Sequence, residues 1–69
     1  MKSRQNADVL PSMIELKGKK VADIGCGDGS LTRLMTRHGA DVIGVEPSQE
    51  QLERARAAKP AGNEIYTEG

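Results

Sequence analysis

The sequence has few of the residues that usually stabilise very small proteins. Its 69 residues include one cysteine and one tyrosine, with no tryptophan or phenylalanine. A single cysteine excludes an internal disulfide, and large aromatic side chains are not available to fill a core. Chains of this length bury only about 60% of the surface that they expose when unfolded. We therefore expect residues 1–69 to form one partial domain of a larger structure.

Excess charge and long apolar runs are also lacking. Ten acidic residues balance ten basic ones, which argues against a general nucleic-acid or anionic-membrane surface. No apolar run approaches the roughly 20 residues of a membrane span. Residues 1–6, which we expect to be flexible, are not followed by the apolar stretch of a signal peptide. One histidine and one cysteine do not make a conventional protein-only metal site. The expected location is the cytoplasm.

The spacing of apolar residues predicts alternating helices and strands. The expected order is a helix over 7–16, a strand over 21–24, a helix over 30–38, a strand over 41–45, a helix over 48–58 and a strand over 64–67. Ser48 and Gln51 have the spacing of a capping box at the start of the third helix. Strands that alternate with helices pair in parallel through right-handed crossovers. The predicted fold class is α/β, Rossmann-like and three-layered, with a partial parallel sheet of about three strands.

A glycine-rich turn joins the first strand to the second helix. We call residues 25–29 (Gly-Cys-Gly-Asp-Gly) the glycine turn; Asp23 comes shortly before it in the first strand. Such a turn is expected to leave backbone N–H groups free at the carboxyl edge of the sheet, where open α/β sheets bind ligands. Glu46 ends the next strand, about 20 residues later, where a carboxylate can accept hydrogen bonds from ribose hydroxyls. Together these features predict an adenosine-containing ligand.

Two kinds of adenosine ligand fit this pattern, and charge separates them. The dinucleotide fingerprint places glycine at its first, third and sixth positions, but with Gly25 as the first position the sixth is Ser30. Asp23 and Asp28 put two acids beside the turn, which disfavours a pyrophosphate and favours a cationic ligand. S-adenosylmethionine carries a sulfonium and an ammonium group, so the charges favour it. A dinucleotide-binding (NAD or FAD) oxidoreductase fragment is the alternative.

The segments VADIGCGDGSLTRLM and VIGVEPS resemble the first motif, and the segment that follows it, of class I S-adenosylmethionine-dependent methyltransferases. The resemblance implies the first half of a seven-stranded fold and a parent reaction that transfers a methyl group to an unidentified acceptor. Because substrate pocket and catalytic groups of this family lie largely beyond the third strand, it also implies that these 69 residues alone are inactive. The cofactor-binding residues that it implies are Asp23, Gly25, Cys26, Gly27 and Gly29 for the methionine end, Glu46 for the ribose and Pro47 for the adenine edge.

Simpler interpretations exist for several of these residues. The glycines can form a tight turn without a ligand, Asp23 can cap the following helix, and Glu46 can be a solvated strand end. Cys26 has no general base beside it in the sequence, so we expect no catalytic residue in this chain. A third hypothesis is a non-catalytic, self-associating module. In the family's sheet the fourth strand flanks the first, so residues 21–24 would expose an unpaired edge that favours a homodimer.

Overall fold

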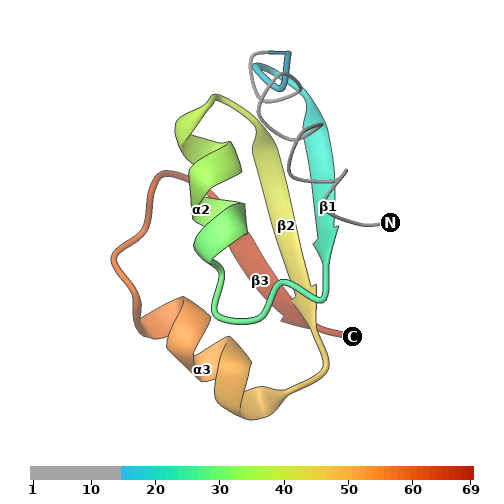
Figure 1. The fold of residues 1–69 in the computed structure, drawn as a ribbon, viewed down its shortest axis with the longest axis vertical. Coiled ribbons are helices and arrows are strands. Elements are labelled where there is room, and N and C mark those ends of the chain that lie inside the picture. Colours follow the sequence, from blue (N-terminus) through green and yellow to red (C-terminus); the bar gives the residue numbers. More distant parts are fainter. Residues whose placement is uncertain (1–14) are drawn as a thin grey trace, which may run out of the picture.

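The computed structural model describes residues 15–69 and contains three strands and two helices (Figure 1). These are β1 (Lys20–Ile24), α2 (Ser30–Arg37), β2 (Asp41–Glu46), α3 (Gln49–Ala57) and β3 (Ile65–Glu68). The five elements expected after residue 20 are confirmed, each with bounds within one residue of the prediction. The flexible segment 1–6 and most of the helix expected over 7–16 lie outside the described residues; residues 15 and 16 are not helical.

The strands form one parallel sheet in the order β1-β2-β3. Ile24 of β1 pairs with Val45 of β2, which in turn pairs with Thr67 of β3, so the carboxyl ends of the three strands meet at one edge. Helix α2 contacts β2, and α3 contacts β2 and β3 (Figure 1). The α/β class and the parallel pairing are therefore confirmed, and the glycine turn lies at the carboxyl edge.

The core lies between the sheet and the helices. Met35, Ala40 and Val42 form a buried cluster beside α2, while Leu52 and Ala55 are buried on α3. Helical spacing places Leu31, Leu34, Met35 and His38 on one face of α2, which predicts that this face is buried. In the structure Leu31 and His38 are exposed and Leu34 is only half-buried, whereas the helix buries Thr32, Met35 and Thr36. A hydrogen bond from Thr32 to β1, described below, accounts for this rotation of the helix.

In the described part of the chain, the opposite face of the sheet carries exposed apolar side chains. Ile24 is 73% exposed and Ile65 is 59% exposed. A hollow of about 450 Å³, lined among others by Ala22 and Ile43, opens between these strands away from the glycine turn. Parallel sheets are usually covered on both faces. The described residues thus provide two of the three predicted layers.

Two further observations concern the described residues only. Between residues 15 and 69, no helix combines the length and the apolar composition that a membrane span requires. Within the same range, His, Cys, Asp and Glu side chains do not gather in threes or more as they do around a bound metal ion.

Candidate functional site at the carboxyl edge of the sheet

The glycine turn folds back on itself through three left-handed residues. Gly25, Gly27 and Gly29 have φ values of 72°, 59° and 86°. Residues that have a Cβ are strained at such positive φ values. The backbone path of the turn therefore explains why glycine occupies every second position. Gly29 is the N-cap residue that precedes α2, and the turn therefore connects the end of β1 directly to the start of that helix.

The N–H groups of the turn are mostly not free, which corrects the expectation of a bare backbone cradle. Four of them donate within the protein: Gly25 (2.7 Å) and Cys26 (3.1 Å) to the carbonyl of Val45, Gly27 (2.7 Å) to Oε1 of Glu46, and Gly29 (3.0 Å) to the carbonyl of Cys26. Three of these N–H groups are occupied because the last two residues of β2 run alongside the turn and supply their acceptors. An anion such as a pyrophosphate would find these four donors already occupied.

Glu46 connects the turn to the third helix. Its carboxylate is 8% exposed, and each oxygen accepts one backbone N–H. Oε1 accepts from Gly27 at 2.7 Å, and Oε2 accepts from Ser48 at 3.0 Å. A carboxylate oxygen can accept two hydrogen bonds, so one further position remains on each oxygen. Glu46 can therefore hold the protein backbone and still accept from the hydroxyls of a ligand.

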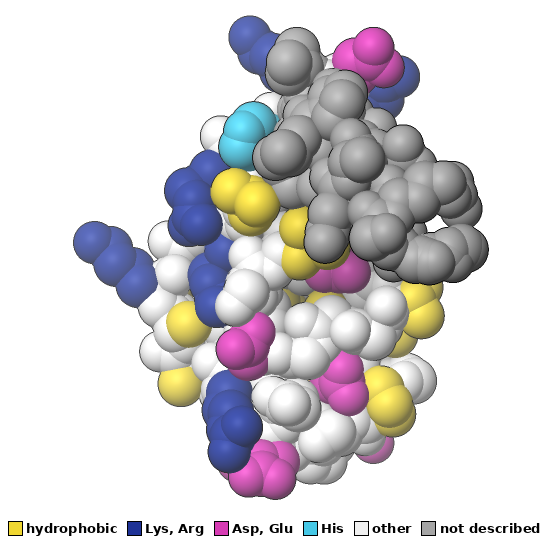
Figure 2. All heavy atoms as spheres, in the orientation of Figure 1, with side chains coloured by type: hydrophobic (Ala, Val, Ile, Leu, Met, Phe, Trp, Pro, Cys, Tyr) yellow, Lys and Arg dark blue, Asp and Glu magenta, His cyan; other side chains and the backbone are white. Residues whose placement is uncertain are grey.

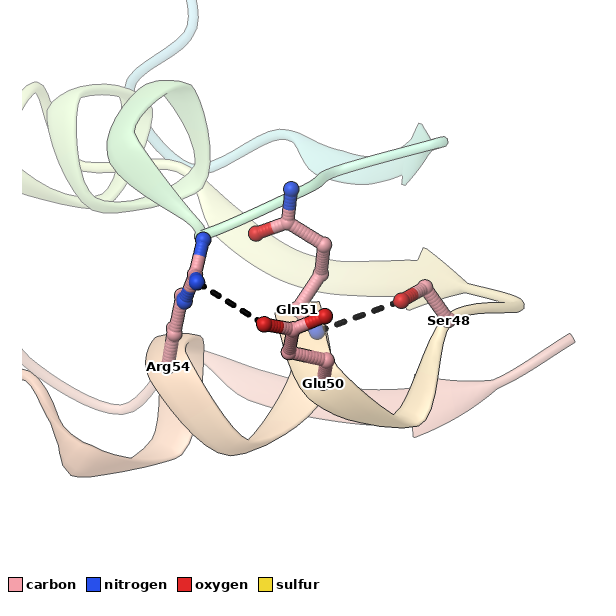
Figure 3. A network of polar contacts seen from close by, with 4 residues as sticks. All are labelled: Ser48, Glu50, Gln51 and Arg54. Carbon is pink, nitrogen blue, oxygen red and sulfur yellow. Dashed lines mark hydrogen bonds and ion pairs between the residues drawn. The ribbon is translucent and has the colours of Figure 1, made fainter.

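The start of α3 shows the consequence of this arrangement (Figure 3). The hydroxyl of Ser48 accepts from the Gln51 N–H at 3.3 Å, as the capping box predicts. The reciprocal contact is missing because the N–H of Ser48 already donates to Glu46. The Gln51 side chain instead points away from Ser48, and its buried Oε1 has no hydrogen-bond partner. Glu50 and Arg54 form an exposed ion pair of 2.9 Å on the same helix, a kind of contact that contributes little to stability.

The two aspartates expected beside the turn both hold the start of α2. Asp23 accepts a 2.6 Å hydrogen bond from the hydroxyl of the fully buried Thr32. Asp28 is exposed and accepts from the hydroxyl (2.8 Å) and the N–H (3.1 Å) of Ser30. Both hydrogen bonds lower the pKa of Asp28, and the one from the Ser30 hydroxyl has the larger effect. Both groups remain carboxylates near the turn, so the site has acceptors and negative charge.

Cys26 points into the protein rather than toward a ligand. It is 8% exposed and packs over Gly44, where an added Cβ would lie 2.8 Å from its sulfur. Burial raises the pKa of this thiol, and the charges of Asp23 and Glu46 raise it further. A protonated, buried thiol is poorly suited to act as a nucleophile.

Arg33 and Tyr66 belong to the surroundings of the turn, although the helical spacing of Arg33 by itself predicts a position on the helix surface. Nη1 of Arg33 donates to the carbonyl of Asp28 at 2.9 Å and to the hydroxyl of Tyr66 at 3.4 Å. Tyr66 is half-buried, which raises its pKa. Arg56 on α3 also donates to the Tyr66 carbonyl at 3.0 Å. Figure 2 shows basic side chains gathered along the side of the molecule where α2 and α3 lie. The side chain of Arg33 is long enough to reach back over the turn, a contact that its spacing does not reveal.

Of the residues expected to bind the cofactor, Gly27 and Glu46 are in direct contact. Pro47 is exposed and follows Glu46 in the chain. Glu68 pairs in register with Glu46 and accepts a 2.6 Å hydrogen bond from the side chain of Gln49. The carboxyl edge therefore gathers two strand-end carboxylates and the glycine turn in one place.

Comparisons with known proteins agree on one family. A family model described as a methyltransferase domain matches residues 21–67. The ubiquinone biosynthesis O-methyltransferase of Aliivibrio fischeri is 50% identical over 48 residues, which make up 70% of this chain and 20% of that protein. The corresponding protein of Acinetobacter baylyi is 51% identical over 41 residues, 59% of this chain and 17% of that protein. The chain thus spans about a fifth of the length of these curated relatives.

Solved structures show the same likeness. An S-adenosylmethionine-dependent methyltransferase from Mesorhizobium loti is 38% identical with a TM-score of 0.77, over 90% of this chain and 30% of that one. A methyltransferase from Thiobacillus denitrificans in complex with S-adenosyl-L-homocysteine is 25% identical with a TM-score of 0.67, over 94% of this chain and 29% of that one.

Proposed function

Because this chain belongs to the methyltransferase domain family, we propose that it forms the S-adenosylmethionine-binding part of a methyltransferase. The observation that supports this proposal most directly is the contact between Glu46 and Gly27, which brings the glycine turn and the strand-end acid together in one site. The family membership confirms the resemblance noted in the sequence. It leaves the dinucleotide-binding alternative without support.

The proposed roles follow the positions of the residues around the carboxyl edge. Glu46 accepts hydrogen bonds from the ribose hydroxyls with the two acceptor positions that the backbone leaves open. Pro47 offers an exposed apolar surface to the adenine. The residues proposed for the methionine end are Asp23, Gly25, Cys26, Gly27 and Gly29; Cys26 would contribute its backbone, because its side chain is buried.

The chemistry of the donor set supports this ligand over a dinucleotide. Four N–H groups of the turn are occupied internally, while carboxylates of Asp23 and Asp28 lie beside it. Such surroundings suit a cationic ligand and repel a pyrophosphate. When bound, S-adenosylmethionine supplies an electrophilic methyl group on its sulfonium. The residues of this chain bind and orient that donor, and the acceptor is held by other parts of the enzyme.

The extent of the chain and its location are also proposals. We propose that residues 1–69 are one partial domain, since the described sheet has an open apolar face and the matched residues cover 20% of the relative from Aliivibrio fischeri. We propose a cytoplasmic location because Cys26, the single cysteine, is free, as is usual where thiols are kept reduced.

Calorimetric titration of the 69-residue chain tests the proposed ligand. We expect S-adenosylhomocysteine to bind more tightly than NAD, and Glu46→Gln to weaken that binding at least about tenfold, since it removes a charged acceptor. Glu64→Gln is the matched control, because Glu64 also accepts two backbone N–H groups but lies outside the site. Tighter binding of NAD, or no binding of S-adenosylhomocysteine, would contradict the proposal.

We further propose that the chain self-associates through β1. Within the described residues β1 is an edge strand, and Ile24 on it is 73% exposed. Unpaired strands with apolar side chains favour pairing with a second chain. In sedimentation velocity we expect a concentration-dependent dimer that Ile24→Lys shifts toward monomer. Leu31→Lys, at an exposed leucine on α2, should leave the equilibrium unchanged. A wild-type chain that stays monomeric would refute the proposal.

A further inference from the structure

Glu46 joins two segments of the site that are 19 residues apart. We propose that Glu46 is a positioning residue that holds the glycine turn in its observed conformation, whether or not a ligand is present. This role is separate from the ribose contact of the proposed function, because it concerns the backbone of the protein and not the ligand.

The geometry of the carboxylate supports a fixed connection. The contact from the Gly27 N–H to Oε1 is 2.7 Å, and the contact from the Ser48 N–H to Oε2 is 3.0 Å. Hydrogen bonds to an ionised group are about twice as strong as neutral ones. Since the side chain is 8% exposed, water competes little for either oxygen. The two bonds together leave the carboxylate one orientation.

The space beside Gly27 is open in the direction of a side chain. A Cβ built on this residue would meet no atom within 4 Å outside its chain neighbours. Its neighbours are held differently, because Gly25 and Cys26 donate to Val45 and Gly29 is covered by Tyr66 and Arg33. Among the described residues, the Glu46 carboxylate is therefore the fixed partner of the turn at its centre.

The start of α3 depends on the same carboxylate. Glu46 occupies the Ser48 N–H that the Gln51 side chain would accept in a complete capping box. The buried Oε1 of Gln51 has no hydrogen-bond partner, because the N–H group that it would accept from donates to Glu46 instead. A change at Glu46 should therefore act on Gly27 and Ser48 together, although they lie in different segments.

Amide hydrogen exchange of the 69-residue chain, followed by NMR, tests the proposal. Glu46→Asp keeps the charge but shortens the side chain by one methylene, so it cannot reach both N–H groups. We expect exchange at Gly27 to accelerate about tenfold to hundredfold relative to buried Val42, the ratio that removes any global loss of stability. Glu64→Asp is the control, since Glu64 accepts from Ala61 and Gly62 at 2.7 Å each. It should accelerate Gly62 and leave Gly27 unchanged.

The positioning role is overturned when exchange at Gly27 keeps its ratio to Val42 in Glu46→Asp while Glu64→Asp accelerates exchange at Gly62. Ligand titration distinguishes this result from a failure of the proposed function: a Glu46→Gln chain that binds S-adenosylhomocysteine normally but exchanges rapidly at Gly27 would remove the ribose contact and retain the positioning role.

Discussion

Gly29→Ala is expected to lower the free energy of unfolding by about 2–3 kcal/mol. Part of this loss is conformational, because φ at Gly29 is +86° and a side chain in the left-handed region costs about 1–2 kcal/mol. The rest is steric, since the new Cβ would lie 2.6 Å from the Tyr66 hydroxyl and 2.7 Å from Nη1 of Arg33. Both atoms end side chains that can move aside, so the steric part lies at the lower end of the range for overpacking, about 1 kcal/mol. A shift of the urea unfolding midpoint measures the sum.

Gly18→Ala separates the two contributions. Gly18 also has a positive φ, +77°, but a Cβ there meets no atom within 4 Å. It should therefore lose only the conformational part, about 1–2 kcal/mol. Tyr66→Phe in the Gly29→Ala background removes the oxygen nearest to the new methyl group and should recover part of the stability. Equal losses at the two glycines would show that Tyr66 and Arg33 do not constrain the turn.

Gly44→Val is expected to cost about 3 kcal/mol or more, the upper end of the range for overpacked cores. Gly44 lies in the middle of β2, where a Cβ would be 2.8 Å from the sulfur of Cys26 and 2.8 Å from Cδ1 of Tyr66. Its φ is not positive, so the effect is steric alone. Gly44→Ala should cost less, about 1–3 kcal/mol, and the series is measured by urea unfolding.

A size compensation and a control sharpen this second prediction. Cys26→Ala should restore part of the stability of Gly44→Ala, because it removes the sulfur that the new methyl group meets. Gly62→Ala is the control: its Cβ would lie 3.1 Å from a methyl group of Thr36 at an exposed loop, and about 0.5 kcal/mol or less is expected. A Gly44→Val chain that unfolds at the wild-type urea concentration would contradict the packing of Cys26 and Tyr66 over β2.

The sequence was sufficient for features that depend on local spacing. The strands and helices after residue 20 follow from apolar periodicity, and the glycines follow from the left-handed path between β1 and α2. The position of Glu46 at a strand end follows from the β-branched residues that precede it. The family was evident because these local features occur together in one short segment.

Features that depend on competition between segments were not predictable in the same way. Spacing assigns the Ser48 N–H to Gln51, but Glu46 takes it because the strand end brings a charged acceptor closer. Leucine spacing on α2 did not reveal that Thr32 donates to Asp23 and turns a different side of the helix toward the sheet. Arg33 was assigned to the surface because its partners, Asp28 and Tyr66, lie in other elements. Each error concerns which of several possible partners a polar group selects in three dimensions.

The order of strands in the sheet has a consequence for how the site assembles. Each strand pairs with the next one in the chain, as Lys20 pairs with Asp41 and Ile43 with Ile65. The loops that close are therefore short, and the entropy lost in closing them grows only slowly with their length. Contacts between segments close in sequence form rapidly. During synthesis from the amino terminus, the turn and its carboxylate can therefore meet while β3 is still being made.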